Sequence, residues 1–155
     1  MITKRIPARD DKRILRLVKR ELIPISSNPP DSYRLKDLRA RLKIGVTYVT
    51  RTSAGVCNGF IHLMRRKEQF WVDMLAIRSA YKRKGLGSKL LRHAERRAIQ
   101  RDFTSIHLMV DAINKTGIAF YMRNGYHIVR YVKEVDAYQM EKQLQTNKNP
   151  LGLSS

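Results

Sequence analysis

The first part of the chain places apolar residues at every third or fourth position, which is the spacing of amphipathic helices. A first helix is predicted from about residue 10 to residue 23, with Asp10 or Asp11 as its N-cap and Pro24 as its stop. A second helix is predicted over residues 32–44, after a rigid linker at residues 28–31 that holds two prolines. The predicted buried positions of both helices are Ile14, Val18, Leu22, Leu35, Leu38 and Leu42.

The middle of the chain changes to the two-residue alternation of strands. Strands are predicted over residues 46–51, 56–64 and 69–77, because runs rich in Val, Ile, Thr and aromatic residues alternate there with polar ones. A tight hairpin at residues 52–55 joins the first two, and a turn at residues 65–68 leads into the third. The predicted arrangement is an antiparallel meander.

After residue 85 the helical period returns, with Leu86, Leu90, Leu91, Ala94 and Ala98 on one side of a helix that ends near residue 101. A strand follows at residues 106–110, then a short helix at 116–124 closed by a glycine, and two last strands at 126–133 and 135–144. The strand, helix and strand from 69 to 110 predict a parallel, right-handed crossover and therefore a mixed sheet.

Length and composition fit one globular domain, because the chain has 155 residues of which 43% are hydrophobic. We assign residues 1–144 to this domain and expect residues 145–155 to be a disordered tail. No apolar run approaches a membrane span, and residues 1–7 lack the apolar core of a secretory signal, so a cytoplasmic protein is expected. The single cysteine, Cys57, excludes an internal disulfide, and the four histidines are too scattered to predict a metal site.

The charge is extreme for this size, with 32 Lys and Arg against 13 Asp and Glu, a net charge of +19 and a pI near 10.6. Residues 78–101 hold nine Lys or Arg and one acid, Glu95, and residues 1–43 hold thirteen against five. Such a balance predicts attraction to polyanions: nucleic acid, anionic lipid or phosphorylated ligands. A non-catalytic module that binds nucleic acid through its basic faces is therefore one open hypothesis.

The candidate for chemistry is the segment Lys82-Arg83-Lys84-Gly85-Leu86-Gly87, which stands between a predicted strand and a predicted helix. Glycines here leave room for an anion beside the unpaired N–H groups of the first helical turn, at the positive end of the helix dipole. Lys82, Arg83, Lys84 and Lys89 add positive charge at this place. The spacing fits neither a Walker loop nor a dinucleotide fingerprint, which needs a third glycine where Leu90 stands. The segment predicts a pyrophosphate cradle for another kind of ligand.

A second motif follows at residues 114–126, where Asn114 precedes the short helix, Phe120 and Tyr121 lie within it, and Gly125 ends it. The phenol of Tyr121 has an ordinary pKa near 10, so at neutral pH it can protonate a departing anion such as a thiolate. Phe120 fits a core position of the helix.

Together these residues resemble the GNAT superfamily of acyl-CoA-dependent N-acetyltransferases. Its pyrophosphate loop, Arg/Gln-x-x-Gly-x-Gly/Ala, matches residues 82–87 after the apolar Ile77, and its later motif, Asn-x-x-Ala-x-x-Leu/Phe-Tyr-x-x-x-Gly-Phe, matches residues 114–126. The resemblance covers about residues 1–144. It implies an α/β (α+β) fold with a mixed, mostly antiparallel sheet of six or seven strands, about four flanking helices and a splayed central strand pair.

Three positions depart from the family pattern. Lys82 replaces the usual Arg or Gln, which keeps a positive charge without bidentate geometry. Arg83 stands where glycine is common and is expected to reach the 3′-phosphate of coenzyme A. Gly117 replaces an alanine, which weakens the short helix by up to about 1 kcal/mol and is expected to let the cofactor approach more closely.

The resemblance also implies the site. Acetyl-CoA is expected between the strand 69–77 and the strand that starts near 104, where an amine attacks the thioester directly, Tyr121 protonates the sulfur, and Asn114 orients the pantetheine or a water. Asp73 is the candidate base, with the alternatives that it binds the substrate amine or pairs with a nearby arginine. The implied cofactor-binding residues are Leu75, Ala76, Ile77, Lys82, Arg83, Lys84, Gly85, Leu86, Gly87, Ser88, Asn114 and Tyr121.

We favour the enzyme over a non-catalytic module that binds acyl-CoA or nucleic acid, because residues 78–101 contain Tyr81 as their only aromatic residue and no helix-turn-helix or zinc pattern. The acceptor is expected to be a primary amine, on a small molecule or a protein, and the positive charge suits an acidic acceptor. No metal and no membrane partner is implied, and the oligomeric state stays open. Further residues that could line the acceptor pocket are His62, Glu68, Trp71 and Glu134.

Overall fold

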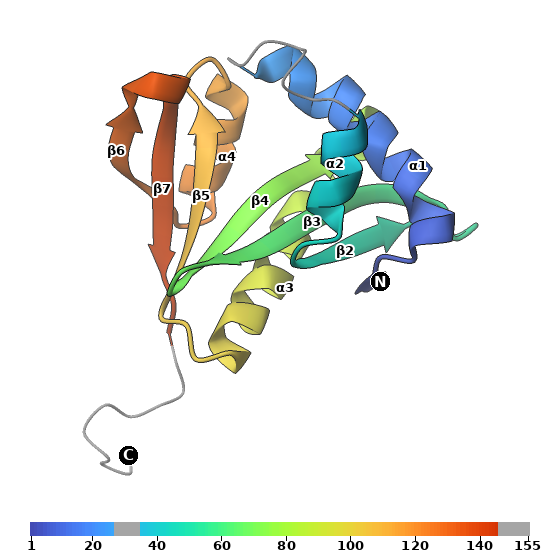
Figure 1. The fold of residues 1–155 in the computed structure, drawn as a ribbon, viewed down its shortest axis with the longest axis horizontal. Coiled ribbons are helices and arrows are strands. Elements are labelled where there is room, and N and C mark those ends of the chain that lie inside the picture. Colours follow the sequence, from blue (N-terminus) through green and yellow to red (C-terminus); the bar gives the residue numbers. More distant parts are fainter. Residues whose placement is uncertain (27–34, 146–155) are drawn as a thin grey trace.

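The computed structural model describes residues 1–26 and 35–145. In chain order its main elements are β1 (Ile2–Lys4), α1 (Pro7–Leu17), α2 (Leu35–Leu42), β2 (Val46–Arg51), β3 (Cys57–Arg66), β4 (Gln69–Ile77), α3 (Leu86–Gln100), β5 (Ser105–Asp111), α4 (Lys115–Arg123), β6 (His127–Val132) and β7 (Ala137–Gln143) (Figure 1). A π-helical segment, Val18–Leu22, and a 3-10 turn, Ile23–Ile25, follow α1. Two more 3-10 turns lie before α3 (Ser79–Tyr81) and between β6 and β7 (Lys133–Val135).

Seven strands form one sheet in the order β1-β2-β3-β4-β5-β7-β6. All neighbouring pairs are antiparallel except β4 and β5, which are parallel and joined by the crossover through α3. The mixed, mostly antiparallel sheet with four helices confirms the predicted fold class.

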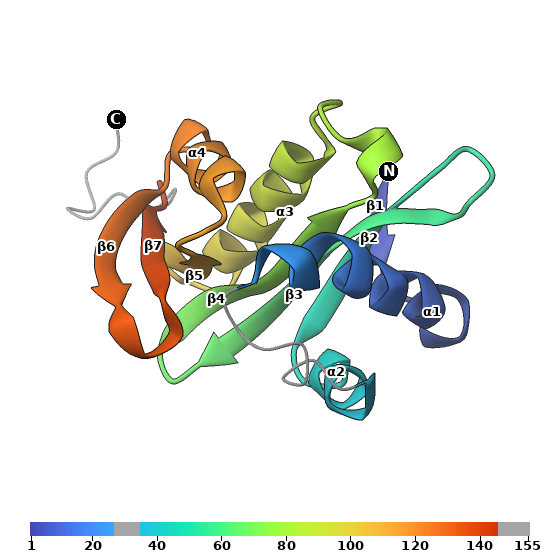
Figure 2. The ribbon, with the colours of Figure 1, turned by 90° about the horizontal axis from the view of Figure 1, so that it is seen from above.

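The helices cover the two faces of this sheet in pairs, with α1 and α2 on one face and α3 and α4 on the other (Figure 2). The larger apolar cluster lies under α3 and includes Leu90, Leu91, Ala94 and Ala98, all fully buried. The second cluster lies under α1 and α2 and includes Ile14, Val18, Leu38 and Leu42. The apolar faces that the sequence predicted for these helices therefore pack on the sheet. Leu22, also predicted to be buried, is partly buried.

The beginning of the chain differs from the prediction in two ways. The short strand β1, which pairs with β2, was not predicted. Helix α1 begins at Pro7 instead of near residue 10, because proline fits the first helical position, where no N–H bond is needed. Asp10 is not the N-cap: it is fully buried, accepts the backbone N–H of Ile6 at 2.7 Å and forms an ion pair with Arg51.

Two predicted segments lie outside the described residues: the proline linker at 28–31, and the tail beyond residue 145. The predicted buried position Leu35 begins α2, and its side chain is also outside the described part. Among the described residues, no helix is both long and apolar enough to cross a membrane.

Candidate active site

The predicted cradle is a turn that leads from β4 into α3. Gly85 is the N-cap of α3 with a φ of 77°, and Arg83 also has a positive φ, 63°. The carbonyl of Gly85 accepts the N–H of Lys89 at 3.0 Å, so the N–H groups of Leu86, Gly87 and Ser88 precede the first intrahelical bond. A Cβ atom at Gly85 would meet nothing within 4 Å. Unpaired donors therefore face open space at the positive end of a fifteen-residue helix, which suits a phosphate group.

The second glycine of the motif has a different function from the first. A Cβ atom at Gly87 would lie 2.9 Å from the ring of Phe120, so Gly87 lets α4 approach the first turn of α3. A Cβ atom at Gly117 would lie 2.3 Å from Nδ2 of Asn114, and the N–H of Gly117 donates to Asn114 Oδ1 at 2.9 Å. The close contact at Gly117 is thus with the side chain that caps α4. The two motifs are brought together through the Gly87–Phe120 contact.

One cation of the cradle is already paired. Lys82 Nζ lies 2.7 Å from Oε2 of Glu21, whose other oxygen accepts the hydroxyl of Ser79 at 2.5 Å. Burial of the Glu21 carboxyl opposes its charged form, but Lys82 and Ser79 outweigh this effect and hold the pKa of Glu21 below its usual value. The sequence did not predict this contact, which links the segment after α1 to the cradle. Arg83 and Lys84 of the cradle form no ion pair with another described residue, so they supply its unpaired charge.

The central strands part next to the cradle. Only Trp71 with His107 and Val72 with Leu108 pair between β4 and β5, so β4 continues beyond Val72 without its parallel neighbour (Figure 1). Opposite β3, His62 pairs with Met74 and Leu63 pairs with Val72. Asp73 is therefore the extra residue of a β-bulge, which bends the strand at the point where it separates. Backbone groups of Leu75, Ala76 and Ile77 lie along the opened edge, where an extended ligand arm could pair with them.

Asp73 pairs with arginines, one of the alternatives that the sequence left open. Its buried Oδ1 atom binds Arg41 of α2 at 2.6 Å and Arg66 of β3 at 3.1 Å. Its other oxygen lies 3.9 Å from Nε2 of the buried His62 and accepts no hydrogen bond from the described residues. Both arginines keep exposed side chains, 38% for Arg41 and 48% for Arg66. The carboxylate therefore anchors two guanidinium groups whose remaining donors face solvent.

Tyr121 is half-buried in α4, between the rings of Phe120 at 5.3 Å and Tyr126 at 5.9 Å. Desolvation raises the pKa of the Tyr121 phenol well above 10, so the phenol keeps its proton throughout the physiological range. Its hydroxyl makes no hydrogen bond to another described residue. Tyr121 packs with the α3 side of the sheet, whereas Asp73 contacts α2, so the two predicted catalytic residues lie on opposite faces of the sheet.

The structure also assembles a polar row that the sequence did not predict. In direct register across four strands stand Trp71, His107, Glu141 and His127. Glu141 lies 3.4 Å from Nδ1 of His107 and 3.6 Å from Nε2 of His127. Burial lowers the pKa of His107 despite this carboxylate. The histidines looked scattered because strand register, which aligns distant residues, is not visible in their spacing.

The residues that the sequence suggested for the acceptor pocket lie in different parts of the structure. Trp71 lies in this row and carries Arg66 over its ring at 5.5 Å. His62 is fully buried and shares a hydrogen bond with Thr47 at 2.7 Å. Glu68 is on the exposed turn between β3 and β4, and Glu134 lies in the turn between β6 and β7.

The cradle can be tested by adding one methyl group. We expect Gly85→Ala to weaken acetyl-CoA binding by roughly 10- to 100-fold, because a Cβ atom would occupy the space in front of the helix donors and disturb a charge-assisted hydrogen bond. Binding is measured by isothermal titration. The control is Gly55→Ala in the β2–β3 hairpin, because Gly55 has a similar φ of 80° and its added Cβ would meet only the flexible end of Arg9. Equal affinities in the two variants would contradict the cradle.

The chain is similar to known acetyltransferases in sequence and in fold. The model of the acetyltransferase (GNAT) family matches residues 13–126. N-alpha-acetyltransferase 50 of Danio rerio is 28% identical over 131 residues, which cover 76% of this chain and 77% of that protein.

Two solved structures share the fold at low identity. Naa20 of Chaetomium thermophilum, in complex with a bisubstrate analogue, has a TM-score of 0.75 at 20% identity, covering 93% of this chain and 86% of its own. PaiA N-acetyltransferase of Thermoplasma acidophilum, in complex with coenzyme A, has a TM-score of 0.76 at 18% identity, with coverages of 92% and 99%. Because the family model matches residues 13–126, well over half of the sequence, the chain belongs to the acetyltransferase (GNAT) family.

Proposed function

We propose that this protein transfers the acetyl group of acetyl-CoA to the α-amino group of a polypeptide that carries an acidic side chain close to its N-terminus. The similarity to N-alpha-acetyltransferase 50 supports the α-amino group as acceptor. The observation that carries the acidic preference is the pair of half-exposed guanidinium groups, Arg41 and Arg66, anchored on the buried Asp73 where β4 and β5 part.

The donor side of the reaction uses the cradle and the opened edge of β4. The N–H groups of residues 83–88 would hold the pyrophosphate, with Lys82, Arg83 and Lys84 nearby. The backbone of Leu75, Ala76 and Ile77 would pair with the pantetheine arm, and an N–H of this stretch would stabilise the oxyanion. Tyr121 would donate its proton to the leaving sulfur, and Asn114, which caps α4, would fix the position of that helix beside the arm.

The acceptor side requires a neutral amine. An α-amino group has an ordinary pKa of about 7.7–8.0, so roughly one tenth to one sixth of it is neutral at pH 7. Such a group can attack without a strong base. We therefore propose that Asp73 acts mainly as the anchor of Arg41 and Arg66, since its Oδ1 atom is used by both.

The Asp73→Asn variant distinguishes a role of Asp73 as anchor of the two arginines from a role as general base. If Asp73 is an anchor, the KM for a peptide with an acidic second residue rises about tenfold, because two guanidinium groups lose their orientation, while the pH at half-maximal kcat stays unchanged. If Asp73 is the base, kcat falls and its rise with pH disappears. The control is Asp11→Asn, which breaks a comparable arginine pair, with Arg5, on α1.

The acceptor class is tested with three peptides that differ only at the second residue: glutamate, glutamine and lysine. We expect kcat/KM to fall in that order, because the lysine peptide meets two guanidinium groups of like charge. Polyamines serve as the small-molecule comparison. Equal use of the three peptides, or faster use of a polyamine, would contradict the proposed acceptor.

A further inference from the structure

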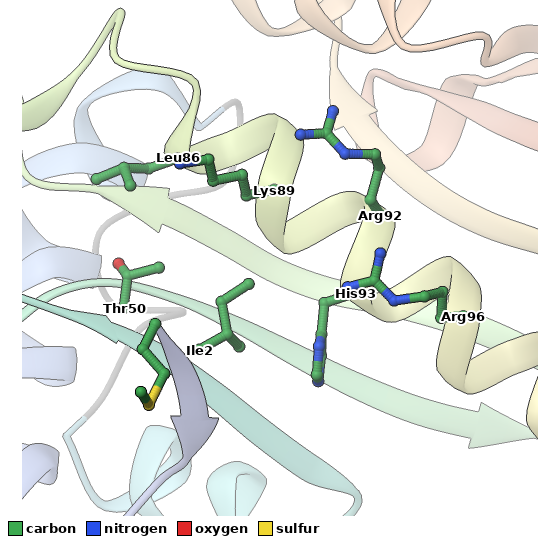
Figure 3. Close-up of a pocket in the computed structure, with 8 residues that line it drawn as sticks. Ile2, Thr50, Leu86, Lys89, Arg92, His93 and Arg96 are labelled. Atoms are coloured by element: carbon green, nitrogen blue, oxygen red, sulfur yellow. The ribbon is translucent and has the colours of Figure 1, made fainter.

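A basic groove lies along α3, on the side that faces away from α4. It has a volume of about 440 Å³ and is lined by Lys89, Arg92, His93 and Arg96 of α3 together with Ile2 of β1 and Thr50 of β2 (Figure 3). We call it the α3 groove. Its position is fixed by contacts on both sides of the helix: Arg97 donates to the hydroxyl of Tyr48 on β2 at 2.6 Å, while Glu95 binds Lys142 on β7 at 2.7 Å.

The cations of the α3 groove have no acidic partners among the described residues. Neither Lys89 nor Arg92 nor Arg96 forms an ion pair there, and all three are exposed. This contrasts with Lys82, Arg51 and Arg41, whose charges are met by Glu21, Asp10 and Asp73. Unpaired like charges on one helix face repel each other, so an anion in the groove would relieve that repulsion.

A buried polar atom in the groove wall also lacks a partner. The Nε2 atom of His93 is inaccessible to solvent and has no hydrogen bond within the described part of the chain. The His93 ring makes an edge contact with Tyr48, with ring centres 4.3 Å apart. Because this nitrogen is closed to solvent, a ligand in the groove would contact the cations of α3 and not this atom.

We propose that the α3 groove binds the phosphodiester backbone of nucleic acid, for which a short RNA duplex is the probe below. Along α3, Lys89, Arg92 and Arg96 are separated by about 4.5 and 6 Å of helix rise, a row of point charges suited to successive phosphates. The residues that line the groove include no Phe, Tyr or Trp on which bases could stack, so the contact is to the backbone and independent of sequence. The local excess of nine cations over one acid in residues 78–101 extends the same field beyond the groove.

The test is the salt dependence of binding to a short mixed-sequence RNA duplex, measured by fluorescence anisotropy without acetyl-CoA. Each lost phosphate contact reduces the steepness with which the logarithm of the binding constant falls with log salt by about one. We expect the double variant Arg92→Ala/Arg96→Ala to reduce this steepness by about two. The matched control is Arg16→Ala/Arg20→Ala, another pair of exposed arginines four residues apart, on the opposite face of the sheet, with the same change of charge.

Three results would overturn the inference. The groove variant and the control could show the same decrease in salt dependence, which would mean that net charge and not the groove attracts RNA. A polyglutamate peptide could bind better than RNA in a groove-dependent way, which would make the ligand an acidic polypeptide. The variant Arg92→Lys/Arg96→Lys, which keeps the charge, could fail to restore binding. Because no readout involves acetyl transfer, failure here is distinct from failure of the proposed function.

Discussion

Replacing Tyr121 by phenylalanine is expected to lower kcat by about 10²- to 10⁴-fold, the usual contribution of a positioned general acid. The phenol is half-buried and keeps its proton at neutral pH, because desolvation raises its pKa. A thiolate that leaves without a proton donor carries its full charge into a poorly solvated site. The affinity for acetyl-CoA should change little, since the proton is needed only as charge develops on sulfur.

The control for this prediction is Tyr131→Phe, which removes a phenol that is half-exposed and bonded to Asp136. Turnover with a saturating peptide and acetyl-CoA affinity are measured for both variants. The pH profile of the wild-type enzyme should show no alkaline fall from Tyr121 below pH 10, because its raised pKa keeps the phenol protonated there. Unchanged turnover in Tyr121→Phe would remove this residue from the acid role.

The second large effect concerns the acceptor. At pH 7 we expect a peptide α-amine to be acetylated at least about 100-fold faster than a lysine side chain in the same sequence with a blocked N-terminus. The reason is the ordinary pKa of each amine, near 7.7–8.0 for the α-amino group and near 10.4 for lysine, which leaves about 300-fold less neutral lysine. Neither substrate is deprotonated by a dedicated base in the proposed mechanism.

The pH dependence of the two rates distinguishes this explanation from selection by the shape of the acceptor site. Between pH 7 and pH 9 the rate with the lysine peptide should rise about tenfold per unit, while the rate with the α-amine levels off near pH 8. Initial rates are measured by release of the CoA thiol at both pH values. A constant ratio of the two rates across this range would show that shape, and not the neutral fraction, selects the acceptor.

Much of the fold could be predicted from local patterns. The stripe of Leu90, Leu91, Ala94 and Ala98 predicted the buried face of α3, and the alternation around residues 46–77 predicted the meander. The Gly-x-Gly turn predicted the helix start at the cradle, because a positive φ at Gly85 is a local requirement. These features depend on neighbours in sequence, which a single chain reveals directly.

The features that were missed depend on residues far apart in the sequence. The pairing of Lys82 with Glu21 and the row through His107 and Glu141 join distant elements, and the sequence could not tell which arginines pair with Asp73. The bulge at Asp73 was also hidden, since it appears only in the register of β4 against β3. The contacts that these candidate residues make with distant parts of the chain required the tertiary structure.

The most direct test of the account is a single transfer reaction. The protein is incubated with acetyl-CoA and a peptide that has an acidic second residue, a free N-terminus and an internal lysine, and the product is mapped by fragmentation mass spectrometry. Acetyl transfer to the α-amino group, lost in Tyr121→Phe and weakened in Gly85→Ala, is the predicted result. Acetylation of the lysine alone, or no transfer although acetyl-CoA binds, would contradict the proposal.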